Sequence, residues 1–255
     1  EALETYYKYG GLPAVALLDN AEDKQNYLRE IYETVYLRDV VDRNNIKNDA
    51  DLKELVRVMA SGIGASTNIR RISNTFKSVS SLNVSPNTIS KYLEYLQDSF
   101  MISSAPRYDV KGRKYIGTET KYYFEDMGIR NVVLDFRQVE PTHIMENVIY
   151  NELRKDGFSV DVGCVEAFER NSANVVQRKR FEIDFVVNRH DERIYIQSAY
   201  AMPTADKLNQ EEASLLRVPD GFRKIIIAAD RYHSGYNEEG IYILGLYDFL
   251  SGYSI

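Results

Sequence analysis

The two segments that decide the fold are Phe181-Glu182-Ile183-Asp184-Phe185-Val186-Val187 and Arg193-Ile194-Tyr195-Ile196-Gln197-Ser198-Ala199. Residue character alternates along each with period two, which is typical of a half-buried strand. The polar residues 188–192 between them predict a turn. The sequence therefore predicts a hairpin whose first strand carries two carboxylates, Glu182 and Asp184, on one face, where a divalent cation could bind.

The composition indicates a cytoplasmic globular protein. The 255 residues carry a formal net charge of -6 and a single cysteine, which excludes an internal disulfide framework and fits a reducing compartment. No apolar run approaches the roughly 20 residues of a membrane span, and no signal peptide is visible. The chain begins without a methionine and, to judge from its first residues, inside a helix, so we expect it to be a C-terminal piece of a longer protein.

The first half of the chain has a helical pattern that leads into a winged helix. A long helix is expected from about Asn20 to Asn44, followed by helices at 51–61, at 67–77 behind a Ser66 or Thr67 cap, and at 86–100. Ser85-Pro86 is an N-cap followed by proline at the first helical position. Two strands, 101–108 and 121–124, then flank the basic turn 111–114. We predict a helical connector at 1–48 and a winged-helix domain at 49–137.

The charge distribution favours contact between this module and nucleic acid. Residues 66–121 hold nine basic and four acidic side chains, a net charge of +5, which leaves the remainder of the chain at -11. The residues expected to contact DNA are Asn87, Thr88 and Lys91 on the recognition helix and Lys111, Arg113 and Lys114 in the wing. Winged helices also dock proteins or serve a purely structural role, so the partner is either DNA or a protein.

From residue 138 the pattern changes to α/β. A helix at 142–155 carries Glu146 on or near its apolar stripe, and a helix at 205–216 follows a Thr204 cap. Strands are expected at 158–164, 181–187, 193–199, 223–229 and 241–244, and a short helix ends the chain near Leu250. Residues 169–180 are predicted to be a loop. We expect an α/β domain over 138–255.

The order of several motifs resembles a known family. Tyr6-Tyr7-Lys8-Tyr9-Gly10-Gly11-Leu12-Pro13, Arg38-Asp39, the Ser85-Pro86 helix, Glu146-Asn147-Val148-Ile149-Tyr150 and Glu182-Ile183-Asp184-Phe185-Val186 occur in sequence. Together they resemble the region of unknown function that follows the AAA+ ATPase domain in many prokaryotic ATPases. The resemblance implies that an ATPase domain precedes Glu1 and binds ATP there. Consistent with this, the chain has no G-x-x-x-x-G-K-[ST] phosphate loop of its own.

The same resemblance implies a restriction-endonuclease-like fold of the PD-(D/E)XK type for the last third. Such nucleases hold Mg²⁺ with an Asp and a Glu on adjacent strands, assisted by a Lys two residues after the Glu and often by a helix Glu. In this sequence the resemblance maps the helix Glu to Glu146 and the Asp to Asp184. The Glu and Lys positions fall on Gln197 and Ala199. We therefore expect a degenerate, inactive domain without bound Mg²⁺.

The sequence leads to one expectation and two rivals. We expect the accessory module of an AAA+ ATPase, which binds DNA or a protein partner through its winged helix and has no enzymatic activity of its own. The first rival is an active Mg²⁺-dependent nuclease with Asp184 and Glu146 as ligands. The second rival is a protein-interaction or oligomerisation module without affinity for nucleic acid.

Overall fold

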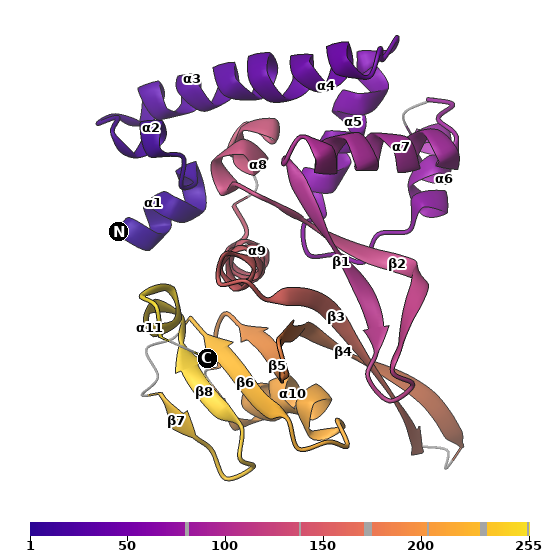
Figure 1. The fold of residues 1–255 in the computed structure, drawn as a ribbon, viewed down its shortest axis with the longest axis vertical. Coiled ribbons are helices and arrows are strands. Elements are labelled where there is room, and N and C mark those ends of the chain that lie inside the picture. The colour runs from indigo at the N-terminus through magenta and orange to yellow at the C-terminus, as the bar shows by residue number, and fades with distance from the viewer. Residues whose placement is uncertain (80–81, 138, 171–174, 203, 230–233, 254) are drawn as a thin grey trace. The chain divides into compact units, whose positions relative to one another are not determined.

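The computed structural model describes the chain except residues 80–81, 138, 171–174, 203, 230–233 and 254 (Figure 1). It divides into two compact units. Unit 1 comprises residues 1–104 and 120–147, and unit 2 comprises residues 105–119 and 148–255. The fold class is mixed α/β, with a large mixed sheet and several helices, as predicted. None of the helices in the described ranges has the length and apolar character needed to cross a bilayer.

Unit 1 is mainly helical, and its N-caps explain where its helices begin. Asn20 accepts a hydrogen bond from the Asp23 N–H and Ser85 accepts one from the Thr88 N–H. The predicted Ser66 or Thr67 cap is wrong, because Asn68 Oδ1 accepts the Arg71 N–H at 3.1 Å. The helices of this unit are α1 Ala2–Tyr9, α2 Pro13–Ala16, α3 Ala21–Ile31, the π-helical turn η1 Tyr32–Leu37, α4 Arg38–Arg43, α5 Asp49–Ser61, α6 Ile69–Val79, α7 Pro86–Asp98 and α8 Met127–Val133.

Helix α8, which sequence periodicity did not reveal, lies at the centre of unit 1 and contacts α1, α3 and α5. Asn131 Nδ2 donates to the Tyr7 and Lys8 carbonyls at 2.8 and 2.9 Å, and Arg130 Nε donates to the Ala60 carbonyl at 2.8 Å. These bonds satisfy carbonyl groups near the ends of α1 and α5. The buried helix therefore joins elements that are far apart in the sequence.

The strands β1 Ile102–Asp109 and β2 Lys114–Phe124 follow α7 and run through both units. In unit 1, Thr67 pairs with Thr120 of β2 in an antiparallel bridge, with the Thr67 N–H donating to the Thr120 carbonyl at 2.8 Å. Thr67 is therefore part of a strand pairing rather than the start of a helix. The helix α9 Pro141–Lys155 also contributes to both units, with residues 141–147 in unit 1 and 148–155 in unit 2.

Unit 2 is built on a mixed sheet whose described strands have the order β2-β1-β3-β4-β5-β6-β8-β7. The predicted hairpin is confirmed, because β4 and β5 are antiparallel and Phe185 is opposite Ile196. Strand β1 is parallel to β3, and β5, β6 and β8 are parallel neighbours. The remaining strands are β3 Ser159–Arg170, β4 Val176–Arg189, β5 Glu192–Ala199, β6 Arg223–Ala228, β7 Gly235–Tyr236 and β8 Tyr242–Gly245.

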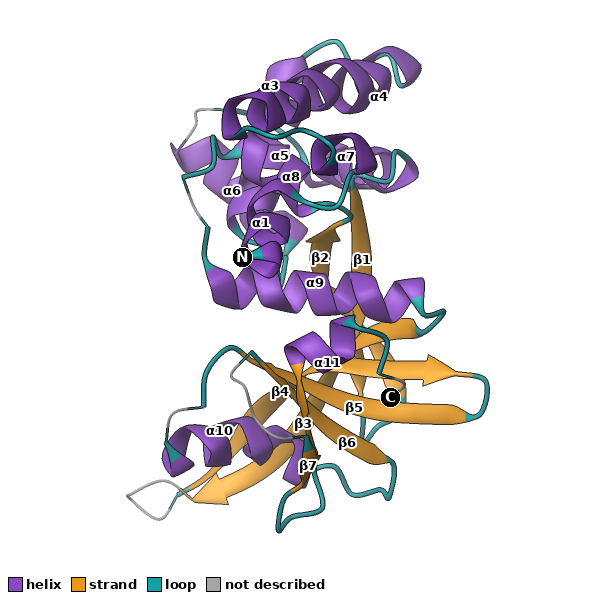
Figure 2. Cartoon of the chain, turned by 90° about the vertical axis from the view of Figure 1, so that its left-hand side faces the viewer, coloured by secondary structure: helices purple, strands orange, loops and turns teal. Residues whose placement is uncertain are grey.

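Helices cover both faces of this sheet. Tyr150 of α9 packs against Phe185 on one face, with ring centroids 6.4 Å apart. The opposite face carries Gln197 and is covered by α10 Ala205–Leu216. The last helix, α11 Leu246–Leu250, contacts β6 and β8 and lies on the other side of the strands from α10 (Figure 2). Polar side chains of the central strands therefore lie beneath α10.

The predicted loop at 169–180 is wrong for the described part of that segment. Residues 165–170 of β3 pair with 176–181 of β4 in six successive antiparallel pairs, from Val165–Phe181 to Arg170–Val176. Residues 177–180 have the sequence Gln-Arg-Lys-Arg. A strand exposed on both faces has no apolar alternation, so its sequence gives no strand signal. The three-part division at 48/49 and 137/138 stays a prediction. Unit 1 holds the predicted connector and most of the predicted winged-helix domain, whereas residues 105–119 of that predicted domain belong to unit 2.

Candidate functional site

The hairpin β4–β5 brings two of the predicted site residues, Asp184 and Gln197, side by side. The Asp184 N–H donates to Gln197 Oε1 at 3.4 Å, and Asp184 Oδ2 accepts the Ser198 N–H at 2.8 Å. Asp184 is only 9% exposed. The backbone N–H of Ser198 therefore orients the Asp184 carboxylate and supplies a hydrogen bond that a buried anion needs.

Helix α10 contributes three polar side chains to the group around Asp184 and Gln197. Gln197 Nε2 is 3.5 Å from Glu211 Oε2, and the Ser214 hydroxyl donates to Gln197 Oε1 at 3.3 Å. Lys207 Nζ forms an ion pair with Glu211 Oε1 at 2.6 Å. We call Asp184, Gln197, Lys207, Glu211 and Ser214 the carboxylate cluster.

The sequence reasoning missed the residues that come from α10. Lys207, Glu211 and Ser214 are spaced i, i+4 and i+7, so the predicted helix 205–216 already placed them on one face. What the sequence did not give was the sheet face against which that helix packs. The signal that was overlooked is therefore the stripe of polar residues on α10, a helix whose Leu215 packs in the core.

The cluster does not fit a Mg²⁺ ion. Mg²⁺ requires near-octahedral oxygen coordination and is commonly held by one or two carboxylates plus water and substrate. Here Glu211 is paired with an ammonium group, and the Gln197 amide oxygen already accepts from Ser214 and from the Asp184 N–H. Across the described ranges, no three His, Cys, Asp or Glu residues are grouped so that they could hold a metal. The position mapped to the catalytic lysine is Ala199, which is buried and has no titratable group.

The prediction that Glu182 and Asp184 share a face of the strand is wrong, because a bulge between Ile183 and Val186 interrupts the alternation of β4. Ile183 therefore lies on the α10 side together with Val186, and Glu182 is on the opposite face, where it pairs with an arginine. Arg107 Nη2 is 3.0 Å from Glu182 Oε2, and Arg107 also pairs with Glu119 of β2. One guanidinium on β1 thus pairs with two carboxylates, one on β2 and one on β4. Arg107 is therefore engaged in ion pairs within unit 2. This reduces the positive charge that residues 66–121 can present to nucleic acid.

Glu146, the predicted helix ligand, lies in unit 1, whereas Asp184 lies in unit 2. Its Oε1 accepts from Lys121 Nζ at 2.9 Å and from the Tyr123 hydroxyl at 2.7 Å. Lys121 and Glu146 are 4% and 8% exposed. Gly64, at φ +70, lies so close that a Cβ added there would be 3.1 Å from the carboxylate oxygens of Glu146. Glu146 therefore forms a buried ion pair that links β2 to α9.

The residues predicted to contact DNA are mostly accessible. Asn87 and Lys91 on α7 are exposed, as are Lys111, Arg113 and Lys114 in the β1–β2 turn. Thr88 is half-buried, and its hydroxyl lies 2.9 Å from Ser85 Oγ in the helix cap. The α7 residues belong to unit 1 and the turn residues to unit 2.

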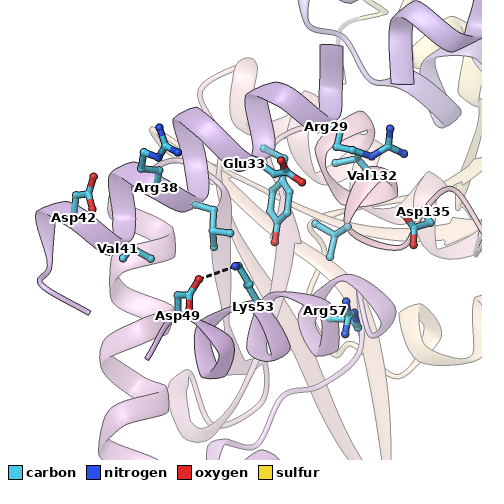
Figure 3. A pocket seen from close by; sticks show the side chains of 13 residues that line it. Arg29, Glu33, Arg38, Val41, Asp42, Asp49, Lys53, Arg57, Val132 and Asp135 are labelled. Atoms are coloured by element: carbon cyan, nitrogen blue, oxygen red, sulfur yellow. Dashed lines mark ion pairs between the residues drawn. The ribbon is translucent and has the colours of Figure 1, made fainter. Parts of the chain in front are cut away.

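Unit 1 also contains a cavity of about 680 Å³, beside the π-helical turn η1 (Figure 3). Insertion of a π turn into an α-helix is often associated with function. Burial raises the pKa of the Tyr32 phenol to about 12, so this group is neutral at physiological pH. The cavity has four cations and four carboxylates, including the ion pair of Asp49 with Lys53, so its lining selects neither sign of charge. The lining comprises Arg29, Tyr32, Glu33, Leu37, Arg38, Val41, Asp42, Asp49, Lys53, Arg57, Val132, Val133 and Asp135.

These features define a protein of two units, one helical and one built on a mixed sheet with a carboxylate cluster in which a lysine pairs with one of the two carboxylates. The chain belongs to a family described as a domain of unknown function, DUF8612, which matches residues 1–140.

Two curated relatives are prokaryotic and uncharacterised. An uncharacterised protein of Haemophilus influenzae is 31% identical over 245 residues, which are 96% of this chain and 56% of that protein. The uncharacterised protein MJ1544 of Methanocaldococcus jannaschii is 28% identical over 211 residues, 83% of this chain and 44% of the relative. The chain thus spans about half the length of these relatives. The crystal structure of protein VC1899 from Vibrio cholerae aligns with 92% of this chain and 55% of its own, at 11% identity and a TM-score of 0.32.

Proposed function

We propose that this chain is the accessory module of a cytoplasmic AAA+ ATPase, that it binds double-stranded DNA for the ATPase domain, and that its second unit is a nuclease-like domain without catalytic activity. In this proposal unit 1 contains a winged helix, and unit 2 is a degenerate relative of the restriction-endonuclease-like fold. ATP binds to the ATPase domain and not to this chain.

The observation that carries the proposal is the order of elements around α7. Helix α5, the Thr67 bridge strand, helices α6 and α7, and then β1 and β2 follow one another as they do in a winged helix. The bridge between Thr67 and Thr120 supplies the short third strand of such a domain. This order supports α7 as the recognition helix and the β1–β2 turn as the wing.

The exposure of the predicted contact residues supports DNA as the partner. Asn87 and Lys91 lie in the N-terminal half of α7, where a recognition helix contacts bases and phosphates. Ile89, Leu93 and Leu96 on the other side of the helix are buried. The polar residues of α7 are therefore not needed for packing and are available to a ligand.

The carboxylate cluster supports the absence of nuclease activity. A metal-dependent phosphodiesterase needs a bound cation and an activated water. Gln197 and Ala199 supply neither the second carboxylate nor a proton-transfer group, and Lys207 neutralises the one extra carboxylate that α10 provides. The link to an ATPase rests on the resemblance of the ordered motifs, and it is consistent with a chain that spans about half of its relatives.

DNA binding is tested by fluorescence anisotropy with a labelled duplex of about 30 base pairs between roughly 50 and 200 mM salt, where phosphate contacts give a steep dependence on salt. We expect Asn87→Ala/Lys91→Ala to weaken binding about tenfold or more. Lys47→Ala/Arg223→Ala, which removes two exposed cations elsewhere, serves as the control and should retain most of the affinity. A wild-type chain that shows no binding at about 50 mM salt would refute DNA as the partner and favour a protein-docking role.

Nuclease activity is tested separately by incubation with plasmid in the presence of Mg²⁺ or Mn²⁺. We expect no nicking above the level of a mock preparation. If the wild-type protein cuts the plasmid and Asp184→Ala does not, the domain is an active nuclease and this part of the proposal fails.

A further inference from the structure

The antiparallel ribbon formed by residues 165–170 and 176–181 is a feature that the winged helix does not account for. β1 pairs with β3 only at Val162, Gly163 and Cys164, and β5 pairs with β4 only from Phe185 onward. Between these limits the described parts of β3 and β4 pair with each other alone. The ribbon extends away from strands β5, β6, β7 and β8 of the sheet (Figure 1).

Cations cluster on this ribbon and on the turn beside it. Arg178, Lys179 and Arg180 of β4 are exposed, and Lys111 Nζ donates to the Glu166 carbonyl of β3 at 3.0 Å. The turn between β1 and β2 therefore lies next to the ribbon within unit 2. Among the residues whose side chains are described, the two segments, which we call the ribbon surface, hold six cations against two carboxylates, a net charge of +4. These charged members are Asp109, Lys111, Arg113, Lys114, Glu166, Arg178, Lys179 and Arg180.

The ribbon also exposes large apolar side chains among these charges. Phe168 is 73% exposed and Val176 is 56% exposed, and Val175, directly before β4, is 55% exposed. Phe168 is the cross-strand partner of Arg178, so an aromatic ring and a guanidinium occupy the same face of the ribbon. Arg178 and Arg180 share the carboxylate of Glu166, so the three side chains carry one net positive charge.

We infer that the ribbon surface is a DNA-binding arm, whose cations contact phosphates and whose Phe168 contacts base edges in a groove. The six cross-strand pairs give a ribbon about 17 Å long at about 3.4 Å per residue. A two-stranded ribbon fits the major groove, and strands also serve as readers of the minor groove. Proteins that bend DNA insert exposed apolar side chains between base steps next to cations on the backbone.

A duplex explains this arrangement better than a lipid surface does. Membrane-bound segments separate an apolar face from a charged one. On the ribbon, Phe168 shares its face with Arg178, Arg180 and the acidic Glu166. A polyanion with grooves accommodates mixed charges and a single aromatic ring, whereas a membrane favours contiguous apolar area.

This inference rests on the proposed function and extends it to a second DNA-binding element, and the experiment separates the two. Arg178→Gln/Lys179→Gln/Arg180→Gln removes the ribbon cations, and Arg154→Gln/Lys155→Gln/Arg223→Gln is the control with the same change in charge elsewhere in unit 2. A plot of log K against log salt has a negative slope. We expect the ribbon variant to make this slope less steep, by up to about 0.9 for each phosphate that the protein no longer neutralises. The control variant should change this slope little.

Phe168→Ser is compared with wild type by energy transfer between the labelled ends of the same duplex. We expect wild-type protein to shorten the distance between the ends and Phe168→Ser to do so less, with affinity reduced several-fold. Circular dichroism of both variants verifies that the sheet is intact.

Three outcomes decide between the proposals. If the α7 variant weakens binding while ribbon and control variants behave alike, the ribbon arm is refuted and the winged helix stands. If the ribbon variant alone weakens binding, the arm is supported and the role of α7 in DNA binding is refuted. If the wild-type protein does not bind DNA but binds anionic phosphatidylserine vesicles, and Phe168→Ser weakens the binding to vesicles, the arm is a lipid-binding element and the inference is overturned.

Discussion

Replacing Lys121 with methionine tests whether Glu146 is a structural anion rather than a metal ligand. At 2.9 Å and an effective dielectric constant of about 20, the attraction between the two charges is about 6 kcal/mol. Desolvation of both groups offsets most of it, so the intact pair contributes little net stability. Lys121→Met, however, leaves the Glu146 carboxylate buried beside the Tyr123 hydroxyl without its counter-charge, and we expect the protein to become less stable by about 3–5 kcal/mol.

The measurement is urea and thermal unfolding of single and double variants. A destabilisation of this size lowers the midpoint of thermal unfolding by roughly 10 °C in a chain of this length. Lys121→Met/Glu146→Gln removes both charges and should recover most of the stability. Lys155→Met, which removes the partner of the exposed ion pair with Glu152, is the control and should cost less than about 1 kcal/mol. The structural role of Glu146 is refuted if Lys121→Met behaves like the control, or if the double variant is no more stable than the single.

Three further predictions concern backbone, thiol and metal chemistry. Gly10→Ala should destabilise by more than about 2 kcal/mol in urea unfolding, because Gly10 has φ +74 and a Cβ would lie 2.2 Å from Asp126 Oδ1. Burial raises the pKa of the Cys164 thiol, so at mildly alkaline pH the native protein should react with a thiol reagent far more slowly than the urea-unfolded chain; equal rates would contradict the burial. Gln197→Glu/Lys207→Met should gain Mn²⁺ affinity in isothermal titration calorimetry, in which we expect no binding by wild type.

The helices and the central hairpin could be predicted because their signals are local. Ser85-Pro86 and Asn20 are caps whose side chains bond to the first turn, and the apolar stripe of α7 is buried. The run from Phe181 to Val187 correctly predicts a strand paired to 193–199, although a bulge between Ile183 and Val186 breaks the predicted alternation of faces. Each of these features depends on residues within about one turn or one strand pair.

The elements that were missed have no local signal. Helix α8 is buried on nearly all sides, so it has no polar face, and it includes Gly128 and Asn131, which are poor helix formers. The ribbon is charged on both faces. The carboxylate cluster depends on which face of the sheet α10 covers, and that is set by the crossover from β5 to β6, which the sequence does not specify.

The carboxylate cluster and the Glu146 pair lead to the same physical conclusion about metal. In unit 1, Glu146, which the resemblance maps to a metal ligand, is paired with the ammonium of Lys121. In unit 2, Glu211, which lies in the same cluster as the mapped ligand Asp184, is paired with the ammonium of Lys207. A divalent ion would have to displace that lysine and compete with an existing hydrogen-bond network.

The variant Gln197→Glu/Lys207→Met tests this conclusion through stability as well as through binding. Three carboxylates would then lie together without a counter-cation, so repulsion should destabilise the metal-free protein. Binding of Mn²⁺ to that variant should restore about 2.7 kcal/mol of stability at a concentration about one hundred times its Kd. If Mn²⁺ instead stabilises wild type and Asp184→Asn abolishes the effect, the lysine does not substitute for a metal.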